Sequence, residues 1–122
     1  MATEKDYLEF FHKVDAEVAG LIAISVVDLD SGMTLAVHTN RQDFDLGTAS
    51  AWNSEMVKMK LKTVRALGLQ SLLEDMLLTL SDQIHLIRLL PPSAFVYVAV
   101  DRAKTNLAIV RSAVARYSAA LG

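Results

Sequence analysis

The chain contains no cysteine among its 122 residues. This absence excludes a disulfide-stapled scaffold, a zinc site built from thiolates and a cysteine nucleophile. Proline is also scarce, and the five glycines are scattered singly, so there is no glycine-rich phosphate loop and no proline-rich linker. We therefore expect a single domain over residues 1–122, without repeats or low-complexity segments.

Long apolar runs and an excess of positive charge are missing as well. The longest strongly apolar run, residues 21–27, is far shorter than the roughly 20 residues that a membrane-spanning helix needs. The charged N-terminus lacks the order of a signal peptide. The formal net charge of −2 means that the chain has no excess of positive charge with which to bind the phosphates of a nucleic acid. We expect a cytoplasmic protein that neither inserts into membranes nor binds nucleic acid.

Residues that could carry catalysis or hold a metal do not form a recognisable constellation. His12, His38 and His85 fall on different predicted elements, and none has a ligand residue at i+4. The segment 28–32 resembles the start of a calcium loop, but Thr39 stands where that loop needs an acidic residue, so a hairpin turn is favoured. No serine lies in a G-x-S-x-G elbow. The sequence predicts no enzyme, no cofactor and no metal site.

Hydrophobic periodicity and turn signals predict the order αββαβββα. The expected helices cover residues 4–18 and 45–67 and a C-terminal segment after Asp101, and the expected strands cover 21–27, 33–38, 76–80, 84–90 and 95–100. Short connections favour an antiparallel meander for the last three strands. The predicted fold class is α/β, as an α+β sandwich: one five-stranded antiparallel sheet carries the helix at 45–67 on one face and the first and last helices on the other.

Local signals set the ends of these helices. Thr3 and Asp6 have the spacing of a capping box, with aspartate in place of the usual glutamate. Asp45 is the expected N-cap of the second helix, and Asp101 is the expected N-cap of the last. Gly68 is expected to end the second helix.

The helix at 45–67 is apolar over too much of its circumference for a helix with one neighbour. At about 100° per residue its apolar side chains span roughly 200°, whereas a one-sided helix needs little more than about 100°. These residues are Leu46, Ala49, Trp52, Met56, Val57, Met59, Leu61, Val64 and Leu67. We expect the second neighbour to be another copy of the chain, because a symmetric dimer is the commonest arrangement. Trp52 itself fits either ordinary core or an interface anchor.

Lys58, Lys62 and Arg65 lie together opposite the apolar arc. They form either a solvated face or a basic stripe that attracts an acidic partner. Asn53 and Lys60 fall inside the apolar arc, so they hydrogen-bond across the dimer or mark a local error in the predicted helix register.

Several segments, taken in order, resemble the Roadblock/dynein light chain family. They are residues 18–20 leading into the strand at 23–28, the turn at 30–32, and residues 95–108, FVYVAVDRAKTNLA. Within the family, the chain resembles the bacterial MglB-type regulators of Ras-like GTPases, over about residues 4–120. The resemblance implies a homodimer in which the second helices pack side by side and the third strands pair edge to edge. Its implied partner is a Ras-like small GTPase or another signalling protein.

The resemblance also implies which residues make contacts. The expected partner-binding residues are Trp52, Glu55, Lys58, Met59, Lys62 and Arg65. The expected dimer contacts are Leu46, Ala49, Asn53, Met56, Lys60, Met76, Leu78 and Leu80. No arginine can be given an arginine-finger role from its spacing. Two alternatives stay open: an adaptor for another signalling or motor complex, and a small-molecule sensor with a cavity between the second helix and the sheet.

Overall fold

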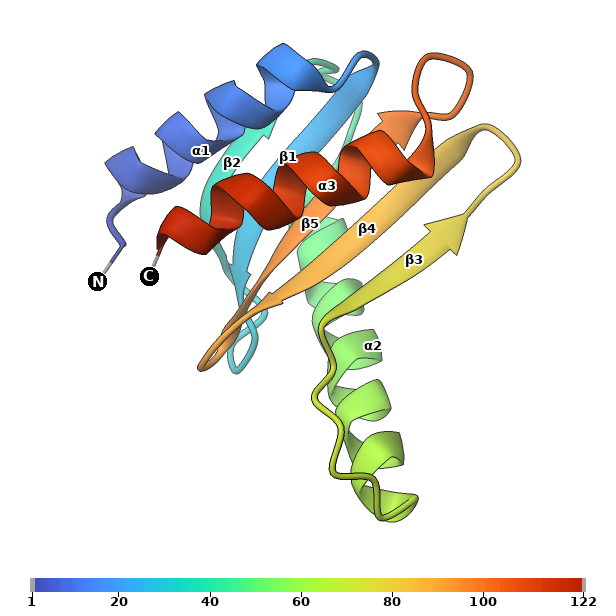
Figure 1. Ribbon diagram of the computed structural model, residues 1–122. Coiled ribbons are helices and arrows are strands. Elements are labelled where there is room, and N and C mark those ends of the chain that lie inside the picture. Colours follow the sequence, from blue (N-terminus) through green and yellow to red (C-terminus); the bar gives the residue numbers. More distant parts are fainter. Residues whose placement is uncertain (1, 122) are drawn as a thin grey trace.

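The computed structural model describes residues 2–121, in which three α-helices lie on the two faces of a five-stranded antiparallel sheet (Figure 1). The elements are α1 (Glu4–Glu17), β1 (Leu21–Asp28), β2 (Thr34–Thr39), α2 (Leu46–Ala66), β3 (Asp75–Thr79), β4 (Gln83–Leu90), β5 (Ala94–Asp101) and α3 (Leu107–Ser118), followed by a short 3-10 turn (Ala119–Leu121). The strand order is β2-β1-β5-β4-β3. The predicted α+β arrangement and the meander of the last three strands are confirmed. No helix within residues 2–121 has the length and apolarity to cross a membrane.

Local hydrogen bonds set the starts of the first two helices, as predicted. The Asp6 N–H donates to the Thr3 hydroxyl (3.3 Å) and the Thr3 N–H donates to the Asp6 carboxylate (2.8 Å), which completes the capping box. The Asp45 carboxylate accepts the Thr48 N–H at 3.0 Å and so caps α2. Gly68 follows the last turn of α2 with a φ of +70°, a conformation that glycine adopts without strain.

The predicted start of the last helix is wrong. β5 extends to Asp101, whose N–H donates to the Gly20 carbonyl at 2.8 Å and whose carboxylate accepts the Ala103 N–H at 2.9 Å. The helix begins only at Leu107, where the Asn106 side chain accepts a backbone N–H. Asp101 and Asn106 are both good caps. Pairing with the sheet engages Asp101, so Asn106 becomes the N-cap.

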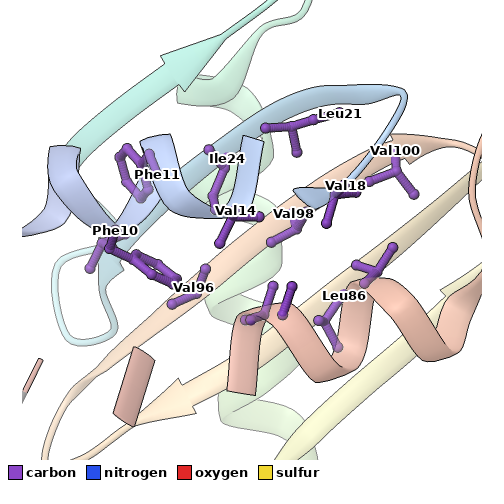
Figure 2. Close-up of a cluster of buried hydrophobic side chains, with 14 of the residues drawn as sticks. Phe10, Phe11, Val14, Val18, Leu21, Ile24, Leu86, Val96, Val98 and Val100 are labelled. Atoms are coloured by element: carbon purple, nitrogen blue, oxygen red, sulfur yellow. The ribbon is translucent and has the colours of Figure 1, made fainter. Parts of the chain in front are cut away.

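The face of the sheet under α1 and α3 carries the larger core cluster (Figure 2). Phe10, Phe11 and Val14 of α1 point onto the strands and are buried. Val110 and Val114 of α3 belong to the same cluster. The central strands β1 and β5 are buried along nearly their whole length because helices cover both of their faces.

The opposite face carries α2 alone, packed mainly on β1 and β2. Its buried side chains are Leu46, Ser50, Ser54 and Val57. The hydroxyls of Ser50 and Ser54 donate to the carbonyl oxygens four residues earlier, each at 2.7 Å, so these small polar groups are satisfied inside the helix. Figure 1 shows that the C-terminal half of α2 projects beyond the sheet, and the chain then returns along it to β3.

Candidate protein-interaction surface

The outer side of α2, turned away from the sheet, exposes two large apolar side chains. Trp52 is 73% exposed and Met59 is 63% exposed. They are seven positions apart, close to two helical turns, so they lie on the same side of the helix. Trp52 is therefore not core within the chain. Large apolar side chains held on a rigid helix are typical of an interaction surface, and tryptophan is enriched at its anchor points.

Charged residues flank these two side chains. Lys58 Nζ lies 3.7 Å from a Glu55 carboxylate oxygen and donates to the Asp30 carbonyl at 3.3 Å, which ties α2 to the turn between β1 and β2. Lys62 and Arg65 lie farther along α2, are exposed, and have no ion pair with any described residue within 4.0 Å. The predicted basic stripe thus contains one lysine with a structural contact and two cations open to solvent.

The sheet face beside α2 is only partly covered. Because α2 rests on β1 and β2, some apolar side chains of the other half of the sheet remain half-buried, among them Met76 and Leu78 of the edge strand β3 and Leu89 of β4. On α2, Ala49, Asn53 and Met56 are half-buried in the same way. Ala49, Met56, Met76 and Leu78 all pack against the same apolar cluster on this face of the sheet, and together with Asn53 we call them the half-covered area.

A polar network that the sequence did not predict lies on this face of the sheet. The Tyr97 hydroxyl is 3.2 Å from His85 Nδ1, and His85 Nε2 is 2.8 Å from the Gln83 side-chain oxygen. Both ring nitrogens are satisfied when Nδ1 accepts from Tyr97 and the Nε2 proton is donated to Gln83. Phe44 packs on both rings, with centroids 6.4 Å away in each case. Gln83 and His85 share a face of β4, but no sequence signal joins them to Tyr97, because the register between β4 and β5 brings Tyr97 beside His85.

Burial shifts the proton affinities of this network. It lowers the pKa of His85 below its usual range, and the nearby Asp82 carboxylate opposes that shift. Burial also raises the pKa of Tyr97 to about 12, and the nearby Asn53 side chain opposes that shift. Both groups are therefore neutral at physiological pH.

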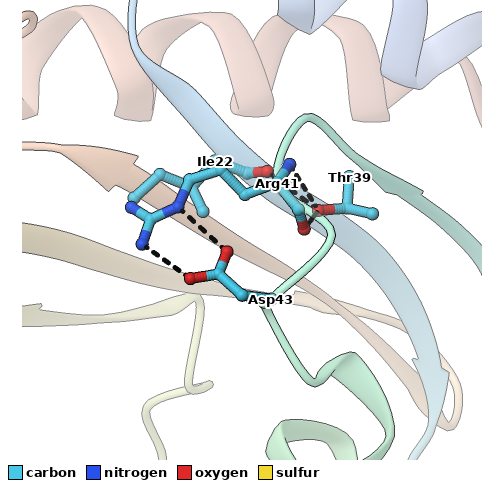
Figure 3. Close-up of polar contacts among 4 residues, drawn as sticks. All are labelled: Ile22, Thr39, Arg41 and Asp43. Atoms are coloured by element: carbon cyan, nitrogen blue, oxygen red, sulfur yellow. Dashed lines mark hydrogen bonds and ion pairs between the residues drawn. The ribbon is translucent and has the colours of Figure 1, made fainter.

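Polar contacts among Ile22, Thr39, Arg41 and Asp43 fix the connection from β2 to α2 (Figure 3). The Thr39 hydroxyl lies 3.2 Å from the Ile22 carbonyl oxygen and accepts the Arg41 N–H at 3.0 Å. Arg41 Nε lies 3.4 Å from an Asp43 carboxylate oxygen, and this hydrogen bond lowers the pKa of Asp43. The Arg41–Asp43 pair is exposed and adds little stability, so the threonine contacts do most to fix the path of the loop.

Comparison with known proteins identifies the fold. No protein-family model and no curated protein matches the sequence. Among solved structures, Myxococcus xanthus MglB matches with a TM-score of 0.84 at 12% identity, over 95% of this chain and 84% of that chain. An MglB structure with a tetrameric arrangement matches with a TM-score of 0.84 at 14% identity, over 97% and 86% of the two chains. A Roadblock/LC7 domain from Streptomyces avermitilis matches with a TM-score of 0.76 at 13% identity, over 88% and 87%.

The chain has a Roadblock-type, MglB-like fold. In this Roadblock-type fold all the predicted partner-binding residues lie on α2, and all except Lys58 are exposed. The predicted dimer residues divide into three groups. Leu46, the first residue of α2, is only 7% exposed because it packs against the sheet in the chain's own core. It therefore offers little surface to a partner. Leu80 lies one residue beyond β3 in the turn to β4, and Lys60 is exposed on α2.

The remaining predicted dimer residues, Ala49, Asn53, Met56, Met76 and Leu78, lie in the half-covered area. Sequence reasoning missed two exposed leucines after α2, Leu69 and Leu72, of which Leu72 is 88% exposed. Leu67, already named in the apolar arc, is exposed as well. Their spacing shows no period, so only the structure distinguishes them from core leucines.

Proposed function

We propose that this protein is a non-catalytic, homodimeric platform that binds and regulates a Ras-like small GTPase in a bacterial cytoplasm. The observation that carries the proposal is the exposed Trp52 and Met59 on the outer side of α2, in a chain with an MglB-like fold. Fold alone does not specify function, so the argument rests on what this surface can bind.

The homodimer is supported by the half-covered area on the α2 side of the sheet. Met76 and Leu78 belong to an edge strand, and an uncovered apolar edge strand promotes aggregation unless a partner pairs with it. A second copy placed there by two-fold symmetry covers β3 and the flank of α2 together. It leaves the outer side of both α2 helices available to a different protein.

That outer side has the composition of a partner-binding surface. Trp52 and Met59 supply the apolar anchors, and the exposed Lys62 and Arg65 supply positive charge for an acidic surface on the GTPase. Two-fold symmetry doubles both features. Binding across two helices can then hold the switch segments of the GTPase in one arrangement, which is how a partner without catalytic groups changes nucleotide turnover.

The test is a binding titration of the purified protein against a panel of bacterial Ras-like GTPases, each loaded with GDP or with a non-hydrolysable GTP analogue. We expect at least one GTPase to bind about tenfold more tightly in one nucleotide state, equivalent to about 1.4 kcal/mol. The double change Trp52→Ala and Met59→Ala should abolish this binding. Ile109→Ala is the matched control, because Ile109 is also an exposed apolar helix residue but lies on α3.

Two outcomes contradict the proposal. Binding that is equally tight in both nucleotide states indicates an adaptor that uses the same platform. No binding to any member of the panel, by a protein that is folded and dimeric, rejects the GTPase as the partner class.

The small-molecule sensor receives less support from the packing. Val57 and Leu46 are buried between α2 and the sheet, where a sensor of this type needs a cavity. A groove of about 900 Å³ lies elsewhere, between the ends of α1 and α3 and the turn from β4 to β5, and Tyr7, Pro92 and Leu121 are among its lining residues.

A further inference from the structure

We infer that the groove between the ends of α1 and α3 and the turn from β4 to β5 binds an alkyl carboxylate, a small anion with an apolar chain. This ligand site is separate from the proposed protein-binding surface, because no residue of α2 lines the groove. The inference therefore goes beyond the proposed function and does not depend on it. It follows from the size of the groove, from its apolar wall and from one arginine that lies in it.

The groove lies where α1 begins and α3 ends. Figure 1 shows these two helix ends beside each other, and the turn from β4 to β5 closes the groove on its third side. The volume is about 900 Å³, within the range of about 300–1,000 Å³ for small-molecule sites. The two helices that cover this face of the sheet thus leave one end of it open, and the opening has the size of a binding site.

The wall of the groove is an uncovered part of the hydrophobic core. Tyr7, Leu90, Ala94 and Leu121 line it, and all four pack against the cluster under α1 and α3 while staying only half-buried. An apolar chain that lies along these side chains removes their remaining apolar surface from water, which is favourable. The wall therefore favours a ligand with an apolar body.

Arg88 of β4 supplies positive charge to the groove. It lies on the same face of the sheet as Leu86 and Leu90, since alternate residues of a strand share a face. Its ion pair among the described residues is with Asp75, at 3.5 Å, too long for a hydrogen bond. The Asp75 carboxylate already accepts two hydrogen bonds from Arg111, at 2.8 and 3.3 Å. Two arginines thus share one carboxylate, which leaves one positive charge and the N–H donors of Arg88 for a ligand.

A carboxylate is the anionic group that suits this arginine. A guanidinium binds a carboxylate through two parallel hydrogen bonds, and such charge-assisted bonds are about twice as strong as neutral ones. The Arg88 side chain is 27% exposed, so the pair would form partly shielded from water, where the attraction is stronger than in bulk solvent.

Two acidic residues also line the groove, and their positions determine how the ligand lies. Glu4 is exposed at the start of α1. The Asp28 carboxylate accepts the Ser31 N–H at 3.0 Å and the Ser31 hydroxyl at 2.6 Å. Asp28 is on β1 and Arg88 is on β4, with β5 between them, so about 10 Å separates the two strands. The carboxylate of the ligand therefore binds at Arg88, and its chain extends along the apolar wall.

Isothermal titration calorimetry with decanoate, below the concentration at which it forms micelles, tests the site. We expect decanoate to bind saturably. Decyltrimethylammonium has an alkyl chain of similar length and the opposite charge, and it should bind about tenfold more weakly or worse. Octanoate is shorter by two methylene groups and should also bind about tenfold more weakly, because it buries less apolar surface.

Two variants separate the contribution of the charge from that of the wall. Arg88→Met should weaken decanoate binding about tenfold or more. Arg102→Met is its matched control, because it removes one positive charge just beyond the other end of β5, and it should bind normally. Ala115→Trp fills the groove and should abolish binding. Ala108→Trp adds the same bulk about two turns earlier on α3, outside the groove, and should bind normally.

Failure of decanoate to bind the unmodified protein overturns the inference, and so does equal affinity for decanoate and decyltrimethylammonium. Normal binding by Ala115→Trp places the ligand elsewhere and also overturns it. Amide chemical shifts of the unmodified protein need no variant: changes around Tyr7 and Leu121 support the site, whereas changes centred on Trp52 reject it. None of these results bears on the proposed function, which the GTPase titration tests separately.

Discussion

Ser25 offers a test of protein stability, because its buried hydroxyl lacks the hydrogen-bond partner that the other buried serine hydroxyls of the described residues have. It lies in the middle of β1, is 0% exposed, and its hydroxyl has no hydrogen-bond partner among the described residues. A buried polar group without a partner costs about 1–3 kcal/mol. Ser25→Ala removes that cost and leaves a space smaller than one methylene group, so we expect the variant to be more stable by about 1 kcal/mol.

Ser54→Ala is the matched control for this change. Ser54 is equally buried, but its hydroxyl donates to the Ser50 carbonyl at 2.7 Å. Losing that hydrogen bond lowers the stability by about 1 kcal/mol, and the higher helix propensity of alanine offsets about half of this loss. The free energy of unfolding of Ser54→Ala should therefore be lower than that of the unmodified protein by no more than about 0.5 kcal/mol.

The assay is thermal and urea unfolding of the three proteins at the same protein concentration, because dimerisation makes the midpoint depend on concentration. For a chain of this size a gain of 1 kcal/mol raises the melting temperature by about 3–5 °C. If Ser25→Ala lowers stability as much as or more than Ser54→Ala, the Ser25 hydroxyl makes a stabilising contact and the reasoning is refuted.

Three further predictions concern the surface and the pH dependence. Replacing Met76 with Lys and Leu78 with Asp should convert the proposed dimer to monomer or aggregate, and an unchanged mass by light scattering would reject edge pairing. Replacing Lys62 and Arg65 with Glu should weaken partner binding about tenfold or more without changing the melting temperature, whereas normal affinity would show that the basic stripe is only a solvated face. Burial lowers the pKa of His85 in the folded protein, so His85 is protonated at a higher pH in the unfolded chain than in the folded one. The contribution of neutral His85 to stability is therefore fully present above about pH 6.5, and it is lost as the pH falls toward the folded-state pKa. His85→Gln should show a smaller loss of urea stability between pH 7.5 and 5.5, and identical losses in the two proteins would contradict this assignment.

Local chemistry explains why much of the fold could be predicted. The boundaries of α1 and α2 depend on Thr3, Asp6 and Asp45, whose hydrogen bonds reach only three residues along the chain. The nearly unbroken apolar run of β1 is typical of a central strand covered on both faces, and the structure buries β1 along nearly its whole length. The start of α3 was misplaced because two good caps, Asp101 and Asn106, stood five positions apart, and only pairing with the sheet chose between them.

The candidate site was predicted less completely because it depends on how α2 is rotated and where it rests. The sequence determined that α2 is apolar around much of its circumference, since side-chain angles follow from helix geometry alone. The tertiary structure decided which part of that arc meets the sheet, so that Leu46 is buried and Trp52 is exposed. It also decided the network of Tyr97 and His85, because the contact between them depends on the register of two strands and not on any local pattern. The apolar periodicity of the sequence determines in which direction each side chain leaves its own helix or strand. Which helices and strands those side chains contact depends on packing across the whole core.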